Sequence, residues 1–499
     1  MNGNVTQDTL ALMKQALAKS GELAKSITLA TGLTAIDLQA PSKNLYPTVT
    51  PLRNSIARVG GGTGTATSWR AVTAITGSGY DAMGWVPEGQ RSARMSYTTA
   101  SKSATFVTIG EEDQMSFEAE AAAQGFEDLD ATMTLRLLQK MMRKEECGIL
   151  GGNASLALGT PATPTLSASG SGATLPGAPT TYSVIVVALT FEGWKNSSLT
   201  GGVATATQFT GADGNSYTLN AGSSNKSSNA TQAVSLGQTL FASVTPLAGA
   251  VAYAWYVGAA GSETLQAITP LNSAAFAAPL ASSRQAATAI TADCSANAGL
   301  AFDGLLTATF NPANNAYVRT LATGTAGTGT ALTASGRGSI DEIDTMLQSM
   351  WDQYRLSPTV LYVNSQELKN ITAKVLTSGS SPLLRYEATA DGPDPYAIVA
   401  AGAVEYYFNP FALDGGVKIP VKVHPDLPPG TLIGWCEHLP SAYQSNEVPN
   451  VAEIKTRRDY YRVDWPLRTR QREVGVYAEE VLAIYAPFAL GAITNIANG

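Results

Sequence analysis

The chain has 499 residues, of which 44% are hydrophobic and 14% are charged, and its formal net charge is −7. This length exceeds one compact core, and the apolar content is ample for two or three, so the sequence predicts a folded multidomain protein. Its charged fraction is low against roughly 25% in typical soluble domains, which suits large surfaces that pack against copies of the same chain. Because the chain has no run of Lys or Arg residues, a dedicated nucleic-acid-binding site is not expected.

The cysteines and the start of the chain bear on its compartment. Cys147, Cys294 and Cys436 are isolated from one another, so they form neither a disulfide framework nor a paired metal-ligand motif. Residues 1–10 lack a basic region followed by an apolar one, and no stretch approaches roughly 18 apolar residues. We therefore expect assembly in a reducing cytoplasm, without secretion or membrane insertion.

Residues 1–59 are interpreted as an N-terminal arm. Residues 10–17 have a modest helical spacing of apolar side chains, and an extended run follows. Three prolines in this run resist both helix and central strand: Pro41, Pro47 and Pro51. The arm is therefore expected to lie along another surface.

Residues 60–110 predict one long β-hairpin, here called the extended loop. After the flexible glycine run 60–64, two strand-like runs, 67–76 and 94–109, flank a turn rich in Gly and Pro. Because a two-stranded ribbon is marginal alone in water, we expect a partner surface on another subunit.

Residues 111–155 contain the clearest helix pattern, from Asp128 to Leu150. Its apolar stripe has four-residue spacing: Leu129, Met133, Leu137 and Met141. At about 1.5 Å per residue this helix would be a rod of about 35 Å, long enough to be the spine of a flat subunit.

Residues 156–299 differ from the rest in charge and are interpreted as an inserted module. Between Ser155 and Leu300 the charged residues are only Glu192, Lys195, Asp213, Lys226, Glu263, Arg284 and Asp293. Flexible Gly151-Gly152 before the module and Ala298-Gly299 after it would let a domain leave and rejoin its host at one place. Such a domain is expected on the outer surface of an assembly and dispensable for it.

Short strands between turns predict that this module is an all-β sandwich. The run 182–191 has the pattern of a buried strand, and apolar residues alternate in a second one: Val251, Tyr253, Trp255 and Val257. The phrase TPLAGAVAYAWYVG, residues 245–258, resembles strands of immunoglobulin-like and fibronectin type III domains.

Residues 300–415 and 416–499 predict a β/α layer followed by strands. Ser339 and Glu342 have the spacing of a capping box that begins a helix, which Pro358 ends. A strand over 359–363 and a helix over 366–376 follow, and apolar alternation over 417–423 and 461–465 predicts terminal strands. The whole chain is therefore expected to be α+β.

Candidate chemistry is sparse. His424-Pro425-Asp426 is better explained as a turn than as a metal site. The acidic clusters Glu111-Glu112-Asp113 and Glu145-Glu146 could supply paired carboxylates, but they are ordinary partners of helix dipoles. No nucleotide-binding or nucleophile-elbow pattern is present. We expect a protein that is not an enzyme, with no catalytic residue, cofactor or metal.

One basic concentration could face DNA or a neighbouring subunit. Its members are Arg457, Arg458, Arg462, Arg468, Arg470 and Arg472. Alternation places Arg468, Arg470 and Arg472 on one strand face. Acidic residues nearby in sequence favour ion pairs between subunits over contact with DNA.

The order of arm, hairpin, spine helix, β/α layer and terminal strands resembles the tailed-phage major capsid fold named after phage Hong Kong 97. Collinear phrases strengthen the resemblance: WVPEG at 85–89, FDGL at 302–305, PTVLYVN at 358–364, VHPDLPPGT at 423–431 and AIYAP at 483–487. It covers roughly residues 40–155 and 300–495. It implies a peripheral domain on the spine helix and terminal strands, and an axial domain around 305–415.

The resemblance also implies a function. Members form pentamers and hexamers that close into an icosahedral shell around double-stranded DNA, and the extended loop lies over a neighbour. This implies a virion protein assembled in the bacterial host cytoplasm, with possible scaffold, portal and decoration partners, and DNA enclosed without sequence-specific binding. Some members crosslink a loop Lys to an Asn of a neighbour. Lys102 is the only Lys of this hairpin, and we expect no such link.

Two other functions remain open from sequence. A tail-tube or decoration subunit of a phage could also carry an immunoglobulin-like module, although the long spine helix disfavours this. A polysaccharide-active enzyme would need exposed aromatic residues near paired carboxylates, and Trp194 and Trp255 are the candidates.

Overall fold

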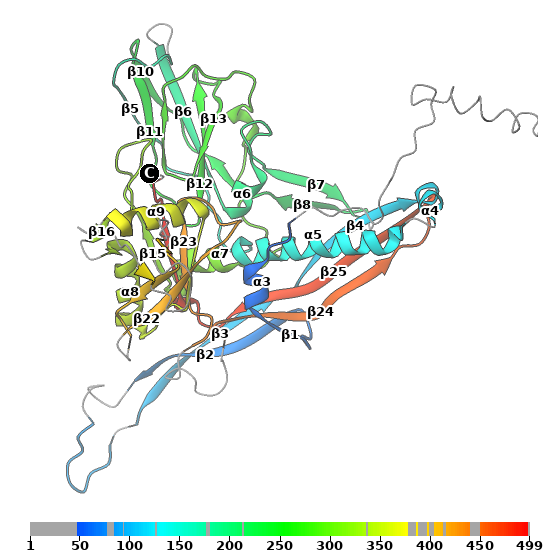
Figure 1. Cartoon of the computed structure of the whole chain (residues 1–499), viewed down its shortest axis with the longest axis vertical. Helices are drawn as coiled ribbons and strands as arrows, with labels where there is room; N and C mark the ends of the chain where they lie inside the picture. The colour runs from blue at the N-terminus through cyan, green and yellow to red at the C-terminus, as the bar shows by residue number, and fades with distance from the viewer. Residues whose placement is uncertain are drawn as a thin grey trace, which may run out of the picture. The chain divides into compact units, whose positions relative to one another are not determined.

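The computed structural model describes residues 47–76, 84–92, 94–124, 127–175, 180–211, 214–335, 338–377, 386–387, 397–398, 404–412, 416–439 and 450–497. The fold is mixed α+β (Figure 1). Residues 48–114 and 133–499 form one compact unit, and residues 1–47 and 115–132 form another. The helix expected over 10–17 lies outside the described residues. No helix of the described chain is long and apolar enough to span a membrane.

A four-stranded sheet joins distant parts of the chain, in the order β1-β24-β25-β4. Its strands are β1 (Ala57–Val59), β24 (Ala452–Asp464), β25 (Gln471–Ile484) and β4 (Val107–Ser116). β1 pairs with β24 in parallel, whereas β24 and β25 form a long antiparallel pair. The terminal strands predicted from alternation are therefore confirmed, although Trp465 lies just beyond the end of β24.

The predicted spine helix is confirmed as α5 (Leu129–Gly151). Met133, Leu137 and Met141 are buried, as the stripe predicted. Asp128 precedes the helix, and its side chain accepts hydrogen bonds from the backbone N–H groups of Asp130 and Ala131, so it caps the N-terminus. A shorter helix, α4 (Phe117–Ala123), lies before α5 in the chain and is capped by Ser116.

The prolines predicted an extended arm, but part of its described segment is helical. Pro51 begins the short helix α3 (Pro51–Ser55). Proline is tolerated at the first helical position because its missing N–H would have no partner there. Residues 57–59 then join the four-stranded sheet as β1, so the described end of the arm is part of the body of the protein.

The predicted hairpin is confirmed as β2 (Ala66–Thr76) and β3 (Ser96–Thr105), an antiparallel two-stranded ribbon. Its second strand is shorter than predicted, because Ile109 belongs to β4. Phe106 separates β3 from β4 and is buried. The ribbon is anchored at its base, where Trp69 contacts the ring of Tyr485 with centroids 5.1 Å apart.

Residues 156–299 contain two antiparallel sheets that share a core. One has the order β10-β6-β12-β13, with β9 also paired to β6, and the other has the order β14-β11-β5. Their strands are β5 (Thr165–Ser169), β6 (Thr180–Leu189), β9 (Ser223–Lys226), β10 (Ala230–Val234), β11 (Thr239–Ser243), β12 (Ala252–Gly258), β13 (Thr264–Thr269) and β14 (Ser273–Phe276). Apolar side chains from both sheets, including Trp255 and Leu240, form a shared core.

The central strands β6 and β12 are buried on both faces. Val186 and Trp255 lie in the core between the sheets, whereas Val187 and Tyr256 lie in a second core on the other side. This explains the continuous apolar run in β6, because a strand covered on both faces has no polar side.

The connection between the insertion and its host is a close backbone contact, contrary to the prediction of flexible glycines. Asn297 N–H donates to Asn153 O (2.8 Å), and Gly304 N–H donates to Gly152 O (2.8 Å). A Cβ on Gly304 would lie 2.6 Å from Gly148 O, and one on Gly152 would lie 2.6 Å from Phe302 O. These glycines therefore permit two segments to approach, and the insertion does leave and rejoin at one place.

The insertion also packs directly on the host. Phe191, at the start of α6 (Phe191–Asn196), and Val251 belong to the host's hydrophobic core. Lys195 forms an ion pair with Asp426 at 2.5 Å. The Asn272 backbone N–H donates to the Asn495 side chain at 2.9 Å. The two parts therefore share apolar and polar contacts.

The remaining layer is a six-stranded sheet in the order β15-β26-β23-β18-β22-β21. Its strands are β15 (Tyr317–Thr320), β18 (Val360–Val363), β21 (Tyr406–Asn409), β22 (Val417–Val423), β23 (Leu432–Trp435) and β26 (Leu490–Thr494). The chain's helices here are α7 (Leu305–Phe310), α8 (Asp341–Tyr354) and α9 (Ser365–Thr377). The β/α layer is therefore confirmed, although only Ile419 of the alternating residues in β22 is fully buried.

The predicted capping box of α8 is wrong. Ser339 lies in the short strand β17 (Ser339–Ile340), and its hydroxyl contacts Ser335. Glu342 instead accepts a hydrogen bond from Thr333 N–H at 2.9 Å. Pro358 does not end α8 either. The helix stops at Tyr354, and the next residue, Arg355, adopts a left-handed conformation with φ 54°.

Candidate functional site

The acidic pair Glu145-Glu146 is buried near the C-terminal end of α5. Sequence reasoning treated these residues as ordinary dipole partners, which is wrong because they lie at the opposite helix end from the one that favours acidic groups. A signal was present in the sequence: Glu145 continues the four-residue stripe of Met133, Leu137 and Met141 toward Ile149. A carboxylate at a position that the periodicity assigns to the core requires a buried partner.

Glu146 joins α5 to the arm and to the loop after β22. Its carboxylate accepts hydrogen bonds from the backbone N–H groups of Leu52 (2.9 Å) and Arg53 (2.7 Å), in the first turn of α3. The same carboxylate lies 2.7 Å from Nε2 of fully buried His424. His424 also accepts from Asp426 N–H through Nδ1 at 3.1 Å, so the predicted turn at 424–426 is confirmed and holds a buried polar contact.

Glu145 is bound by two arginines and a tyrosine. Arg53 Nε donates to it at 2.8 Å, and Arg58 Nη1 and the Tyr460 hydroxyl also contact its carboxylate. Burial raises the pKa of the Tyr460 hydroxyl, and the nearby Glu145 charge raises it further. The hydroxyl therefore stays protonated and donates to Glu145.

Arg58 connects this pair to the four-stranded sheet. Its Nη2 lies 2.7 Å from Asp459 in β24 and 3.1 Å from Glu480 in β25. Burial lowers the pKa of Arg58, but the attraction of Glu145 and Glu480 outweighs this and leaves the pKa raised. For Glu480, burial raises the pKa of its carboxyl group and repulsion from Glu145 adds to the effect, while Arg58 opposes it.

We call these residues the arm clasp: Arg53, Arg58, Glu145, Glu146, His424, Asp459, Tyr460 and Glu480. The clasp brings together α3, β1, α5, β24, β25 and the loop after β22. Each carboxylate has at least one donor from the same chain, although Oε1 of Glu480 is buried without a hydrogen-bond partner. The arm clasp therefore has a structural role. It holds in place the segment that precedes residue 60, where the extended loop begins.

The ribbon β2–β3 carries exposed apolar side chains on one face. The register shifts between Val72 and Ala74, so that Val72 and Ile75 fall on the same face, where Ile75 lies opposite Tyr97. Val72 is 60% exposed, Ile75 67% and Tyr97 68%. Trp85, beyond the end of β2, is 90% exposed. This apolar face is a candidate contact surface.

The basic concentration is only partly a strand face. Arg468 and Arg470 lie in the turn between β24 and β25, so the predicted alternation across 468–472 is wrong. Arg457 forms an ion pair with Glu479 at 2.5 Å, and Arg462 forms one with Asp464 at 2.7 Å.

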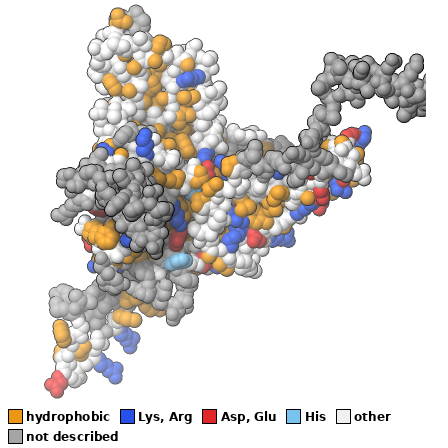
Figure 2. Space-filling model, viewed as in Figure 1, with side chains coloured by type: hydrophobic (Ala, Val, Ile, Leu, Met, Phe, Trp, Pro, Cys, Tyr) orange, Lys and Arg blue, Asp and Glu red, His pale blue; other side chains and the backbone are white. Residues whose placement is uncertain are grey.

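The acidic cluster at 111–113 lies in strand β4 and not in a helix. Glu111 forms an ion pair with Lys144, and Glu112 accepts a hydrogen bond from the Tyr477 hydroxyl. Figure 2 shows blue and red side chains over α5, β24 and β25, and few over the sandwich.

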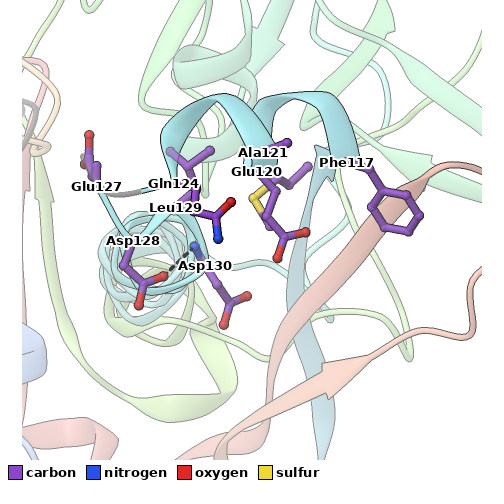
Figure 3. A pocket seen from close by; sticks show the side chains of 9 residues that line it. Phe117, Glu120, Ala121, Gln124, Glu127, Asp128, Leu129 and Asp130 are labelled. Carbon is purple, nitrogen blue, oxygen red and sulfur yellow. Dashed lines mark hydrogen bonds between the residues drawn. The ribbon is translucent and has the colours of Figure 1, made fainter.

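A hollow of about 420 Å³ lies beside α4 and the start of α5 (Figure 3). It is lined by Met115, Phe117, Glu120, Ala121, Gln124, Glu127, Asp128, Leu129 and Asp130. Its acidic groups have helix-end roles: Asp128 caps α5, and Glu127 accepts from the Thr132 hydroxyl at 2.9 Å. No group of three or more potential metal ligands occurs within the described residues.

The comparisons with known proteins give only remote likenesses. No model of a known family matches the sequence, and no curated protein matches it. Among solved structures, the chain is similar to the capsid of the native GTA particle (9% identity, TM-score 0.42), covering 94% of this chain and 97% of that one. It is also similar to the capsid of Myoviridae phage XM1 (11%, 0.41, covering 94% and 99%) and to the cyanophage A-1(L) capsid (12%, 0.42, covering 94% and 99%). At such identities and TM-scores these likenesses establish neither a family nor a function for this chain.

Proposed function

We propose that this chain is the major capsid protein of a tailed bacteriophage, a subunit that forms the pentamers and hexamers of an icosahedral shell around double-stranded DNA. The observation that carries the proposal is the apolar face of the ribbon β2–β3. It exposes Val72, Ile75 and Tyr97 on a two-stranded element that is marginal alone in water. A large apolar surface on a folded subunit marks a contact with another protein.

The order of elements supports the Hong Kong 97-like assignment. Along the chain the arm comes first, followed by the ribbon, α5, the six-stranded layer and the terminal strands. This is the order expected of the Hong Kong 97-like fold. In this proposal, α5 with β24 and β25 is the peripheral domain, and residues 300–415 are the axial domain. Residues 156–299 are an immunoglobulin-like insertion, supported by two facing antiparallel sheets with a shared core.

The arm clasp supports a structural rather than catalytic role. Its carboxylates are bound by Arg53, Arg58 and His424 within the chain, which suits a fastener of the subunit. The protein would act in the virion after assembly in the host cytoplasm. Scaffold, portal and decoration proteins would be its partners, and DNA would be enclosed without sequence-specific binding.

The polysaccharide-active alternative loses its aromatic candidates. Trp255 is fully buried between the sheets, where its indole N–H donates to Thr269 at 2.8 Å. Trp194 packs against Phe191 beside the host core. The buried Trp255 ring offers no face to a sugar, and the Lys195 ammonium lies over the partly buried Trp194 ring, 5.1 Å from its centroid.

Negative-stain microscopy of the purified protein tests the proposal against its alternatives. We expect closed shells, because the subunit carries its own apolar contact surface. Tubes would instead support a tail-tube subunit, and dispersed particles at all protein concentrations would contradict self-assembly.

Lys102 provides a separate test for covalent crosslinking of the shell. It is exposed on β3, opposite Trp69 in the register, on the ribbon face away from Tyr97. We expect mature particles to run as one band at 51.8 kDa on denaturing gels. A ladder of higher bands that disappears in Lys102→Ala would show that this lysine is a crosslinking residue.

A further inference from the structure

The hollow beside α4 and the start of α5, here called the α4 hollow, is lined by both apolar and acidic side chains (Figure 3). Met115, Phe117 and Leu129 are among the apolar ones, and Glu120 and Asp130 are among the acidic ones. Its volume of about 420 Å³ lies in the range of roughly 300–1,000 Å³ that is typical of binding pockets. The α4 hollow is therefore large enough to receive side chains from another segment.

The helix α4 lacks the burial that would stabilise it on its own. It has seven residues, and none of them is buried. Isolated helices shorter than about 12–15 residues are marginal in water, because most helical stability in proteins comes from the packing of one face. The cap from Ser116 satisfies one backbone donor and does not replace that packing. We therefore expect a further element to cover α4 in the folded protein.

The charges around the α4 hollow indicate which kind of element fits it. Residues 115–132 contain five acidic residues and no basic one: Glu118, Glu120, Glu127, Asp128 and Asp130. Asp128 and Glu127 have roles at the start of α5, but their charges still add to a field that attracts cations. An occupant should therefore combine an apolar face with basic side chains, whereas the phosphates of nucleic acid would be repelled.

The N-terminal segment of the chain has this combination in its sequence. Leu10, Met13 and Leu17 have the spacing of one helix face. Lys14 lies four residues after Leu10 and three before Leu17, so a helix would place it beside this apolar stripe. Between residues 9 and 20 the charged residues are Lys14 and Lys19 only. The segment is therefore complementary to the α4 hollow in both apolar character and charge.

The same chain can bring this segment to the α4 hollow. Residues 1–47 and 115–132 belong to one compact unit. Residues 18–46 would span up to about 95 Å when extended, whereas the 23 residues of α5 are only about 35 Å long. The connecting chain is therefore long enough for an intramolecular contact. Because it also acts as a tether, it favours that contact over the same contact between dilute subunits.

We propose that residues 10–20 form an amphipathic helix that docks into the α4 hollow of the same chain. The stripe of Leu10, Met13 and Leu17 packs against α4 and the start of α5, and Lys14 faces the acidic side chains. This contact gives α4 the packing that it lacks and fixes the N-terminal segment on the subunit. It does not depend on the proposed shell function, because it forms within one chain.

Hydrogen exchange of the full-length subunit tests the docking. The backbone amides of α4 should be protected in the parent chain, and Leu17→Ser should speed their exchange by about tenfold or more, because the stripe loses a buried leucine. Leu12→Ser is the matched control, since Leu12 lies about 120° around the helix from the centre of the stripe, and it should leave α4 unchanged. The amides of β6 report that neither variant unfolds the subunit. Unprotected α4 amides in the parent chain, or equal effects of the two variants, would overturn the docking.

A site-directed crosslink identifies which chain supplies the segment. In Ala16→Cys with Ala121→Cys, one thiol lies on the segment and the other lines the α4 hollow. A short bis-maleimide should join them within one chain, and the linked peptide should be recovered from the monomer band of a denaturing gel. Ala16→Cys with Ala259→Cys, at an exposed turn of the sandwich, is the control and should give no link. The absence of any link to residue 121, or a link found only in the dimer band because a second copy supplies the segment, would overturn the intrachain contact.

Discussion

Deleting residues 66–105, with a short glycine turn in their place, should yield a soluble subunit that no longer forms closed shells. The deletion removes the ribbon β2–β3, including exposed Val72, Ile75 and Tyr97. Among the described residues of the ribbon none is fully buried, and its contacts with the body include Trp69 against the ring of Tyr485 and Ala104 at the edge of the core. The body should therefore keep its fold while its largest expected intersubunit contact disappears.

The measurement is sedimentation of the purified variant together with electron microscopy. Circular dichroism establishes that the subunit remains folded. A gentler pair of variants separates the two ribbon faces: Val72→Ser with Tyr97→Ser should impair assembly, whereas Lys102→Ser on the opposite face should not. Normal shells from the folded deletion variant would show that the ribbon is not an intersubunit element.

Arg58→Ala should destabilise the subunit strongly. Arg58 is the cation shared by Glu145, Asp459 and Glu480 in the arm clasp, and both glutamates are buried. Its removal leaves buried Glu480 without its ion-pair partner, while Glu145 keeps Arg53, and loss of one partner from a buried ion pair costs about 3–5 kcal/mol. We expect the urea midpoint of the isolated subunit to fall accordingly, and the arm to become accessible to protease.

The matched control is another arginine with an exposed partner. Arg355 lies 3.9 Å from Asp352, and both side chains are more than half exposed. Arg355→Ala should therefore cost less than about 1 kcal/mol. Arg58→Lys should be intermediate, because it restores the charge but not the forked donors that reach three carboxylates. Equal losses at positions 58 and 355 would mean that the clasp does not hold the arm.

Elements that depend on local patterns were predictable from the sequence. The four-residue stripe defined α5, and the apolar run of β6 indicated a buried strand. The two strands flanking a Gly- and Pro-rich turn gave the ribbon β2–β3. In each case the signal is the spacing of side chains within one element, which the sequence displays directly.

Features that depend on distant partners were not predictable. Glu145 is bound by Arg53, Arg58 and Tyr460, which lie 92, 87 and 315 residues away in the chain. The capping box failed for a different reason, because other nearby polar groups compete for its members: Thr333 N–H, nine residues before Glu342, donates to its carboxylate, and Ser335, four residues before Ser339, contacts its hydroxyl. The glycines at the base of the insertion suggested flexibility because sequence does not reveal which backbone lies against them.

The backbone pairing at the base of the insertion makes this a position where one domain could be exchanged for another. Asn153 and Asn297 are bonded side by side, so the host chain needs only two adjacent ends to continue from α5 into residues 302–310. Any domain whose termini lie about one strand spacing apart, near 5 Å, could be substituted there without stretching the host. Phe191, Val251 and Lys195 would leave with the native module, so a grafted domain must cover the surface that they now occupy. Retaining the stretch around α6 as an adaptor would meet that requirement and turn the subunit into a scaffold for display.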